Sequence, residues 1–178
     1  MEILKDYIDL NPYKIKENVF SLLDNKWMLI TAGTKENFNM MTASWGGLGV
    51  LWNKAVVTIF IRPQRYTYKF IEENPSFSIC FFDKEYKPAL NFCGTKSGRD
   101  YDKVKETGLT PAVTPNNNIT FKEAYLSIDC VKLYSDDLKP DNFINKQLIE
   151  KIYPTKDFHR FYIGEIVGCY SIEKEILH

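Results

Sequence analysis

The chain has 178 residues, of which 44% are hydrophobic and 15% aromatic, and its 23 basic residues balance its 23 acidic residues. This length and composition predict a single folded domain over residues 1–178 and argue against disorder. The neutral balance lacks the basic face of a nucleic-acid-binding protein, and no apolar run approaches the ~20 residues that span a bilayer. We therefore expect neither a nucleic-acid nor a membrane partner.

The first half of the chain predicts a short helix and then a hairpin. Residues 17–25 could form the helix, and the apolar run 27–32 is typical of a strand. A polar turn over 33–38 leads into a return strand over 39–45. Closely spaced glycines at 46, 47 and 49 then allow the backbone to bend sharply or to approach another group closely.

The rest of the chain alternates strands with short helices. Residues 55–62 give the strongest strand prediction, because they are rich in β-branched side chains and end at Pro63. Further strands are expected over 77–81, 124–134 and 158–172, and further helices over 66–74, 100–107 and 141–151. In the helix over 100–107, Asp100 is the expected N-cap and Gly108 the left-handed residue that ends it.

This order of elements predicts a mostly β fold. Five or six strands with short connecting helices favour a mostly antiparallel barrel. A doubly wound parallel sheet needs regular strand–helix alternation and a glycine-rich strand-to-helix turn, and the sequence has neither.

Cysteine and histidine usage argues against a metal site. The four cysteines (Cys80, Cys93, Cys130 and Cys169) form no C-x-x-C pair, and the only histidines are His159 and His178. No secretory signal is evident, so we expect a cytoplasmic protein with reduced thiols in its core.

The segment 62–67 places two arginines and a threonine between a buried strand and a predicted helix. Unpaired N–H groups and the positive dipole end of a helix suit a phosphate, and arginine adds a bidentate contact. The alternative is an ordinary strand end, with Thr67 as a helix cap and the arginines in solvent.

Two other segments are dense in polar residues. In 94–103, Ser97, Gly98 and Arg99 precede a helix with Lys103 one turn in, although Asp100 and Asp102 could neutralise the helix dipole without an external anion. In 39–47, small and hydroxyl side chains next to Trp45 could line a flat ring; a plain strand and tight turn is the alternative.

Taken in order, four motifs resemble the flavin-reductase-like FMN-binding split-barrel family, in its flavoredoxin-type branch, over about residues 11–172. They are NMMTASWGGLGVLW (39–52), RPQRYT (62–67), GTKSGRDYDK (94–103) and HRFYIGEIVG (159–168). The resemblance implies an antiparallel Greek-key split β-barrel with short peripheral helices, its core over about 13–174 behind an N-terminal extension of 1–12. It also implies FMN as cofactor and a homodimer with flavin near the interface, where Trp52, Phe82 and Phe92 could be buried.

The resemblance also implies roles for individual residues. Thr42, Ala43, Ser44 and Trp45 would lie along the flavin ring and ribityl chain, and Asn39 of the same motif would also bind the cofactor. Arg62, Arg65, Tyr66 and Thr67 would hold the phosphate and ribityl end, and Ser97, Gly98, Arg99 and Lys103 would close over the phosphate. His159 would act near the flavin or nicotinamide, although a histidine after a turn could equally be a solvated loop residue.

These roles predict an NAD(P)H-dependent flavin reductase, in which the cofactor performs the redox chemistry. No G-x-S-x-G motif or other nucleophilic set is visible. Two alternatives stay open: a flavoredoxin-like FMN electron carrier that receives electrons from a protein partner, and a flavin-binding or sensing module without turnover.

Overall fold

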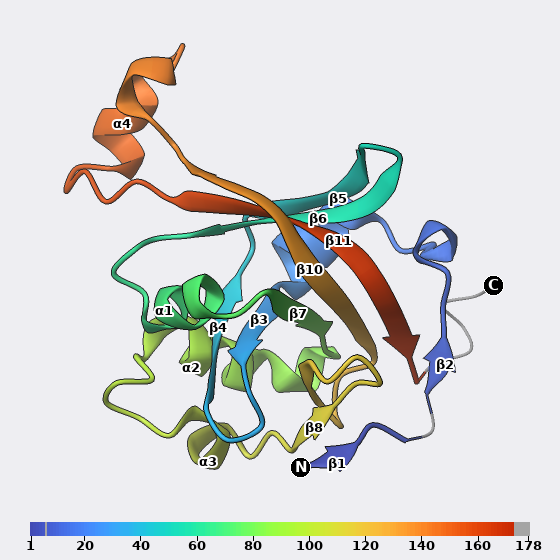
Figure 1. The fold of residues 1–178 in the computed structure, drawn as a ribbon. Coiled ribbons are helices and arrows are strands. Elements are labelled where there is room, and N and C mark those ends of the chain that lie inside the picture. Colours follow the sequence, from blue (N-terminus) through green and yellow to red (C-terminus); the bar gives the residue numbers. More distant parts are fainter. Residues whose placement is uncertain (6, 173–178) are drawn as a thin grey trace.

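The computed structural model describes residues 1–5 and 7–172, so His178 and the last two expected core residues, 173–174, lie outside the described part. Figure 1 shows a strongly curved sheet with helices around it. Within the described residues this sheet has eight strands, in the order β4-β3-β7-β10-β11-β6-β5 with β2 also pairing β11, and its neighbouring strands are antiparallel. The strands are β2 (Ile8–Asp9), β3 (Met28–Gly33), β4 (Phe38–Ala43), β5 (Gly46–Leu51), β6 (Lys54–Ile61), β7 (Ser76–Phe81), β10 (Leu126–Asp137) and β11 (Arg160–Ser171).

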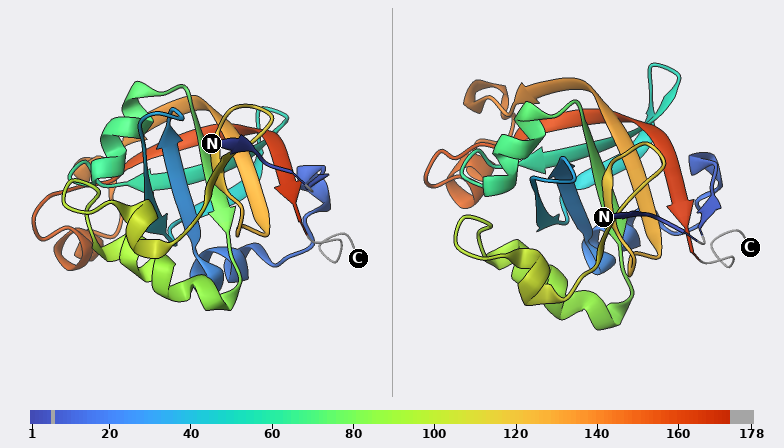
Figure 2. Two further views of the ribbon diagram at one scale, coloured as in Figure 1. Left: turned by 90° about the horizontal axis from the view of Figure 1, so that it is seen from below. Right: turned by 60° about the horizontal axis from the view of Figure 1, so that its bottom comes forward.

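A second, three-stranded sheet contains the start of the chain. It consists of β1 (Glu2–Ile3), β8 (Pro111–Val113) and β9 (Ile119–Phe121), with β1 parallel to β8. Figure 2 shows β1 lying beside this hairpin. Residues 1–12, expected to form an extension, thus contribute strands to both sheets.

Short helical segments connect the strands. They are the π-helix Ser21–Lys26, the 3-10 turns Pro12–Lys14, Lys84–Tyr86 and Pro140–Asn142, and the α-helices α1 (Tyr66–Glu73), α2 (Lys87–Thr95), α3 (Lys103–Thr107) and α4 (Gln147–Ile152). Figure 1 shows α4 projecting from the far end of β10 and β11. The mostly β, antiparallel split-barrel prediction is confirmed.

The sheet separates two apolar clusters, which explains why β3 is an unbroken apolar run. Met28 and Ile30 face a cluster that includes Phe70 of α1, whereas Leu29 between them faces a second cluster with Leu90 of α2. Successive side chains of a strand point to opposite faces, so all three β3 residues are fully buried. Phe82, considered for an interface, belongs to the second cluster and is 2% exposed.

The two edges of the large sheet are joined directly. β4 and β5 stand at opposite ends of the strand order, yet only Ser44 and Trp45 separate them in sequence. The chain therefore passes from one sheet edge to the other at this point. The glycines, which could have bent the chain or allowed a close approach, form β5, an extended strand along β6, and a Cβ on Gly46 would lie 2.6 Å from the Thr58 carbonyl oxygen.

Several predicted boundaries were wrong for local reasons. The N–H of Asp100 bonds to the Ser97 carbonyl, so Asp100 belongs to a turn, and Asp102 caps α3 by accepting from the N–H of Lys105 at 3.2 Å. Gly108 has φ 71°, as predicted for a left-handed end residue. The helix expected over 17–25 is present over residues 19–26, with a π-helical segment from Ser21 to Lys26. The helix expected over 141–151 is only α4 after a 3-10 turn.

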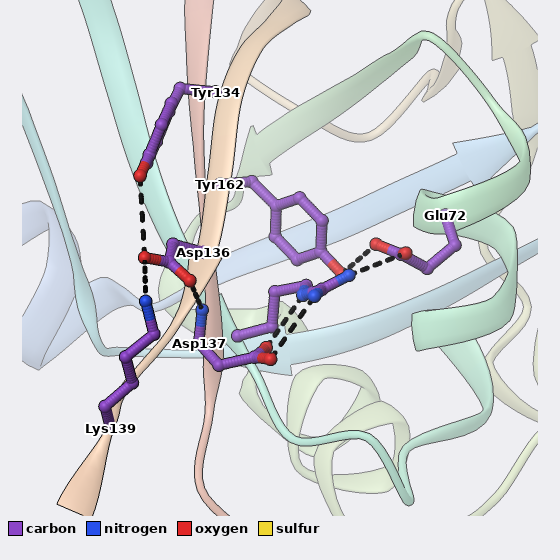
Figure 3. A network of polar contacts seen from close by, with 7 residues as sticks. Glu72, Tyr134, Asp136, Asp137, Lys139 and Tyr162 are labelled. Carbon is purple, nitrogen blue, oxygen red and sulfur yellow. Dashed lines mark hydrogen bonds and ion pairs between the residues drawn. The ribbon is translucent and has the colours of Figure 1, made fainter.

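A polar network ties the C-terminal end of α1 to the long β10–β11 pair (Figure 3). Glu72 of α1 accepts from the Tyr162 hydroxyl at 2.7 Å and from Arg160 Nη1 at 2.9 Å. Arg160 Nε also donates to Asp137 Oδ1 at 2.8 Å. These contacts fix the start of β11, and with it the preceding His159, relative to α1.

Candidate functional site

Two adjoining cavities lie beside β4, and one of them reaches the point where β4 passes into β5. We name them the Trp45 cavity, of about 280 Å³, and the Arg99 cavity, of about 180 Å³. The Trp45 cavity is lined by Met41, Thr42, Ala43, Ser44, Trp45, Phe60, Arg62, Arg65, Gly94 and His159. The Arg99 cavity is lined by Met41, Gln64, Arg65, Tyr66, Thr67, Thr95, Lys96, Ser97, Gly98, Arg99 and Lys103. Because Met41 and Arg65 line both cavities, a single ligand could occupy the two together.

Arg65 lies at the junction of the cavities and at the start of α1. Its Nη2 donates to the Gly94 carbonyl at 2.5 Å, and it forms no ion pair within the described part of the chain. Burial, followed by repulsion from Arg62, lowers its pKa. Among the described residues no side chain caps α1, and Thr67, considered as a cap, is buried. The junction therefore carries positive charge with N–H groups still to be satisfied.

Arg99 extends the positive charge over the outer wall. Its guanidinium lies 4.9 Å from the centroid of the Tyr66 ring, and its Nη1 donates to the Gln64 carbonyl at 3.1 Å. The Ser97 hydroxyl accepts from the backbone N–H of Arg99 at 3.2 Å, which keeps the loop in a turn. Arg99 itself is exposed and makes no ion pair with any described carboxylate.

Lys103 approaches the Arg99 cavity from the interior. It is 5% exposed, and its ammonium donates to the carbonyls of Met40, at 2.8 Å, and Cys93, at 2.9 Å. Burial lowers its pKa to about 8; Arg65 adds to the lowering and Cys93 opposes it. Two of its three N–H donors are thus occupied, so Lys103 supplies charge to the cavity while tying α3 to β4 and α2.

Asn39 supports the site from behind. It is buried and lines neither cavity, and its Nδ2 donates to Thr67 Oγ1 at 2.8 Å. A Cβ placed on Gly98 would lie 2.2 Å from Asn39 Oδ1, so only glycine allows the 97–99 loop to approach this closely. Thr42 Oγ1 similarly donates to the Leu90 carbonyl at 2.6 Å, which ties β4 to α2.

Arg62 anchors a wall of the Trp45 cavity. Its Nη1 forms an ion pair with Asp157 at 2.5 Å, and its Nη2 donates to the Ile152 carbonyl at 3.1 Å. The Thr155 hydroxyl, then Arg62 and Gln64, hold the pKa of the Asp157 carboxyl well below its usual range. Of the two arginines in the segment 62–67, Arg62 therefore has its charge compensated and Arg65 does not.

His159 completes that wall. It is 8% exposed, so the alternative of a solvated loop residue is wrong. Its ring centroid lies 5.1 Å from that of Trp45, and its Nδ1 lies 2.8 Å from the hydroxyl of Tyr153, a residue that sequence reasoning did not single out. Burial and repulsion from Arg62, against attraction to Asp157, lower the pKa of His159 to about 4. The imidazole is therefore neutral near pH 7.

The described part of the chain contains no group of three or more His, Cys, Asp or Glu side chains that could hold a metal ion. It also contains no helix that is both long and apolar enough to cross a membrane. The four cysteines are free and buried in the structure.

Comparison with known proteins identifies the family. Residues 20–177 match the family model described as flavin reductase like domain. The chain belongs to this family. A search of curated proteins returned no match.

Solved structures show the same fold. A flavoredoxin from Methanosarcina acetivorans is 24% identical with a TM-score of 0.64, over 84% of this chain and 69% of that one. An FMN-binding domain of a flavin reductase-like enzyme from Shewanella baltica OS155 is 17% identical with a TM-score of 0.67, over 93% and 76%. An NADH:FAD oxidoreductase from Streptomyces globisporus C-1027 is 13% identical with a TM-score of 0.61, over 82% and 74%.

Proposed function

We propose that this protein binds FMN and acts as an NAD(P)H-dependent flavin reductase. The observation that carries the proposal is the pair of cavities that meet at Arg65. One is walled by the aromatic side chains Trp45, Phe60 and His159, and the other by cations that have no carboxylate partner among the described residues. A planar ring joined to a single terminal phosphate matches this pairing, since apolar walls hold the ring and charged N–H donors hold the phosphate.

Different residues would then bind different parts of the cofactor. Arg65, Arg99, Ser97 and the start of α1 would hold the phosphate, and Lys103 would add charge from the interior. The segment 42–45 would lie along the ring and ribityl chain, with Tyr66 and Thr67 at the other cavity. When bound, the flavin supplies hydride and electron transfer, while the protein binds it, orients it and controls access to it.

Two further features belong to the proposal. We propose a homodimer, supported by the exposed apolar side chains at the β5–β6 turn, where Val50 is 62% and Trp52 56% exposed. A cytoplasmic location also stays a prediction of the sequence.

Reduction by a nicotinamide tests the proposed activity. We expect anaerobic mixing of FMN-loaded protein with NADH or NADPH to bleach the flavin absorbance in a stopped-flow experiment. The variant His159→Ala should keep nearly the same FMN affinity but show a lower kcat/KM for the nicotinamide, because His159 lines the Trp45 cavity and not the Arg99 cavity, where Arg99 and Lys103 lie. If neither nicotinamide reduces the wild type within minutes, the reductase proposal should be abandoned.

The second candidate is an FMN electron carrier that exchanges electrons with a redox protein. Trp45, beside the ring-sized cavity, is 48% exposed, so a partner protein could approach the cofactor directly. For a carrier we expect little nicotinamide turnover in the wild type and no effect of His159→Ala on it. The same stopped-flow traces therefore separate the two candidates.

The close approach at Gly98 gives a prediction about cofactor binding. In Gly98→Ala the new Cβ would displace the loop from Asn39, and Arg99 would move with it. We expect FMN affinity, measured by fluorescence quenching, to fall about 5–30-fold, equivalent to about 1–2 kcal/mol. Gly49→Ala is the matched control, since its Cβ would meet nothing within 4 Å. Equal affinity in the two variants would contradict the role of this loop.

A further inference from the structure

Tyr153 and His159 form a buried pair behind the Trp45 cavity. Tyr153 is 5% exposed and His159 8% exposed, and Tyr153 Oη lies 2.8 Å from His159 Nδ1. His159 lines the cavity, whereas Tyr153 does not. The hydroxyl therefore contacts the side of the imidazole that faces away from the cavity.

The direction of this hydrogen bond follows from the hydrogen-bonding capacity of the pair. Burial raises the pKa of Tyr153, so its hydroxyl keeps its proton. In the described part of the chain, this hydroxyl has no hydrogen-bond partner besides His159. If Nδ1 were the donor, the buried O–H would have no acceptor, which is costly. Tyr153 therefore donates and Nδ1 accepts, which places the single imidazole proton on Nε2.

The Nε2 atom remains available to a ligand. Within the described part of the chain it makes no hydrogen bond, and it is not among the fully buried polar atoms that lack a partner there. A ring nitrogen that is not fully buried and has no partner among the described residues reaches open space, and His159 lines the Trp45 cavity, so this cavity is open space available to Nε2. The cavity thus receives an N–H donor.

Surrounding contacts keep the pair in this state. The Tyr153 ring stacks on Phe158 at a centroid distance of 4.7 Å, and the Tyr153 N–H donates to the Ile149 carbonyl at 2.9 Å. The Arg62 guanidinium, 5.4 Å from the Tyr153 ring centroid, disfavours a proton on both imidazole nitrogens, while Asp157, paired with Arg62, only partly offsets it. The imidazole is held both in orientation and in its neutral form.

We infer that Tyr153 is a positioning residue that locks His159 as the neutral Nε2–H tautomer, so that the Trp45 cavity presents one fixed N–H donor to its ligand. The ligand class that suits this donor beside the Trp45 ring is a planar heteroaromatic with a carbonyl oxygen or unprotonated ring nitrogen at its edge. Only the identity of that ligand as flavin or nicotinamide rests on the proposed function.

The tautomer can be measured without any ligand. In ¹⁵N-labelled protein at pH 7, a two-bond ¹H–¹⁵N correlation spectrum distinguishes the two neutral tautomers and the imidazolium. His159→Gln assigns the signals, because His178 is the only other histidine. We expect the wild type to show the Nε2–H pattern and Tyr153→Phe to show a mixture of tautomers. The control Tyr13→Phe, at a 64% exposed tyrosine, should match the wild type.

An Nδ1–H pattern or an imidazolium in the wild type would overturn the inference, even if Tyr153→Phe failed to fold. An unchanged pattern in a folded Tyr153→Phe variant would also overturn it. In a parallel measurement on FMN-loaded protein, we expect Tyr153→Phe to lower kcat/KM for the nicotinamide by about twofold for an equal mixture of tautomers, less than His159→Ala does, and to leave FMN affinity nearly unchanged. If the wild type holds the Nε2–H tautomer but binds neither riboflavin nor FMN, the proposed function fails and the tautomer assignment stands.

Discussion

Replacing Arg65 with methionine is expected to weaken FMN binding by at least tenfold. Arg65 lines both cavities and has no carboxylate partner among the described residues, so its charge is available to a phosphate. A hydrogen bond to a charged group contributes roughly 1.5–3 kcal/mol, and about 1.4 kcal/mol corresponds to a tenfold change in affinity. Methionine keeps the length of the apolar stem, so the loss comes mainly from the guanidinium.

The effect should depend on the phosphate. Calorimetric titration with FMN and with riboflavin separates the two ends of the ligand, and we expect Arg65→Met to lose more affinity for FMN than for riboflavin. Lys69→Met is the matched control, because Lys69 is an exposed cation on the same helix and lines neither cavity. Thermal unfolding without flavin checks that loss of the bond to the Gly94 carbonyl has not unfolded the protein. Unchanged FMN affinity would remove Arg65 from the phosphate site.

Strands with strong local signals were predictable from the sequence. The β-branched run of β6 and the apolar alternation of β7 reflect side-chain burial on a sheet, a property that neighbouring residues already encode. β5 was not predicted, because its glycines have low strand propensity. Its pairing with β6, a long-range contact, makes it a strand. The helix α2 was also missed, although Pro88 in its first turn was an available signal.

In the candidate site, too, long-range contacts decided what the local sequence could not predict. Its three polar segments were recognised individually by composition at strand and helix ends, and the structure brings them together around Arg65. The pairing of Arg62 with Asp157 joins residues 95 positions apart, so local sequence could not reveal it. Likewise, the interior location of Lys103 depends on the carbonyls of two other elements. Sequence therefore identified candidate ligand-binding residues more readily than it distinguished those that face a ligand from those that support them.

The largest effect on stability is expected from Asp129→Asn, and its size should depend on pH. Asp129 lies on β10 and is 0% exposed. Its Oδ2 accepts from the Thr114 hydroxyl at 2.5 Å, whereas its Oδ1 has no hydrogen-bond partner among the described residues. Burial raises the pKa of this carboxyl to about 6, although the Thr114 hydroxyl and nearby Asn118 and Asn116 oppose the shift. The ionised form is therefore the unfavourable one in the folded protein.

The sign of the pH dependence follows from proton linkage. Between the unfolded pKa of 3.8 and the folded value of about 6, the folded state holds more protons on Asp129 than the unfolded state does. The contribution of Asp129 to stability is therefore fully present below the unfolded pKa and is lost as pH rises through 6. Asparagine does not titrate, so the free energy of unfolding of Asp129→Asn should rise relative to that of the wild type over this pH range. At pH 8 the variant should be more stable by on the order of 1–3 kcal/mol.

Urea unfolding of both proteins at pH 4.5, 6 and 8 measures this difference directly. The lowered pKa of His159 also removes stability as pH falls toward 4. This contribution cancels between wild type and variant, because each comparison is made at one pH. The exposed Asp24→Asn is the control and should stay within about 0.5 kcal/mol of the wild type at every pH. An Asp129→Asn variant less stable than the wild type at pH 8 would instead mean that the ionised carboxylate stabilises β10 through its bond to Thr114, despite the unpartnered oxygen.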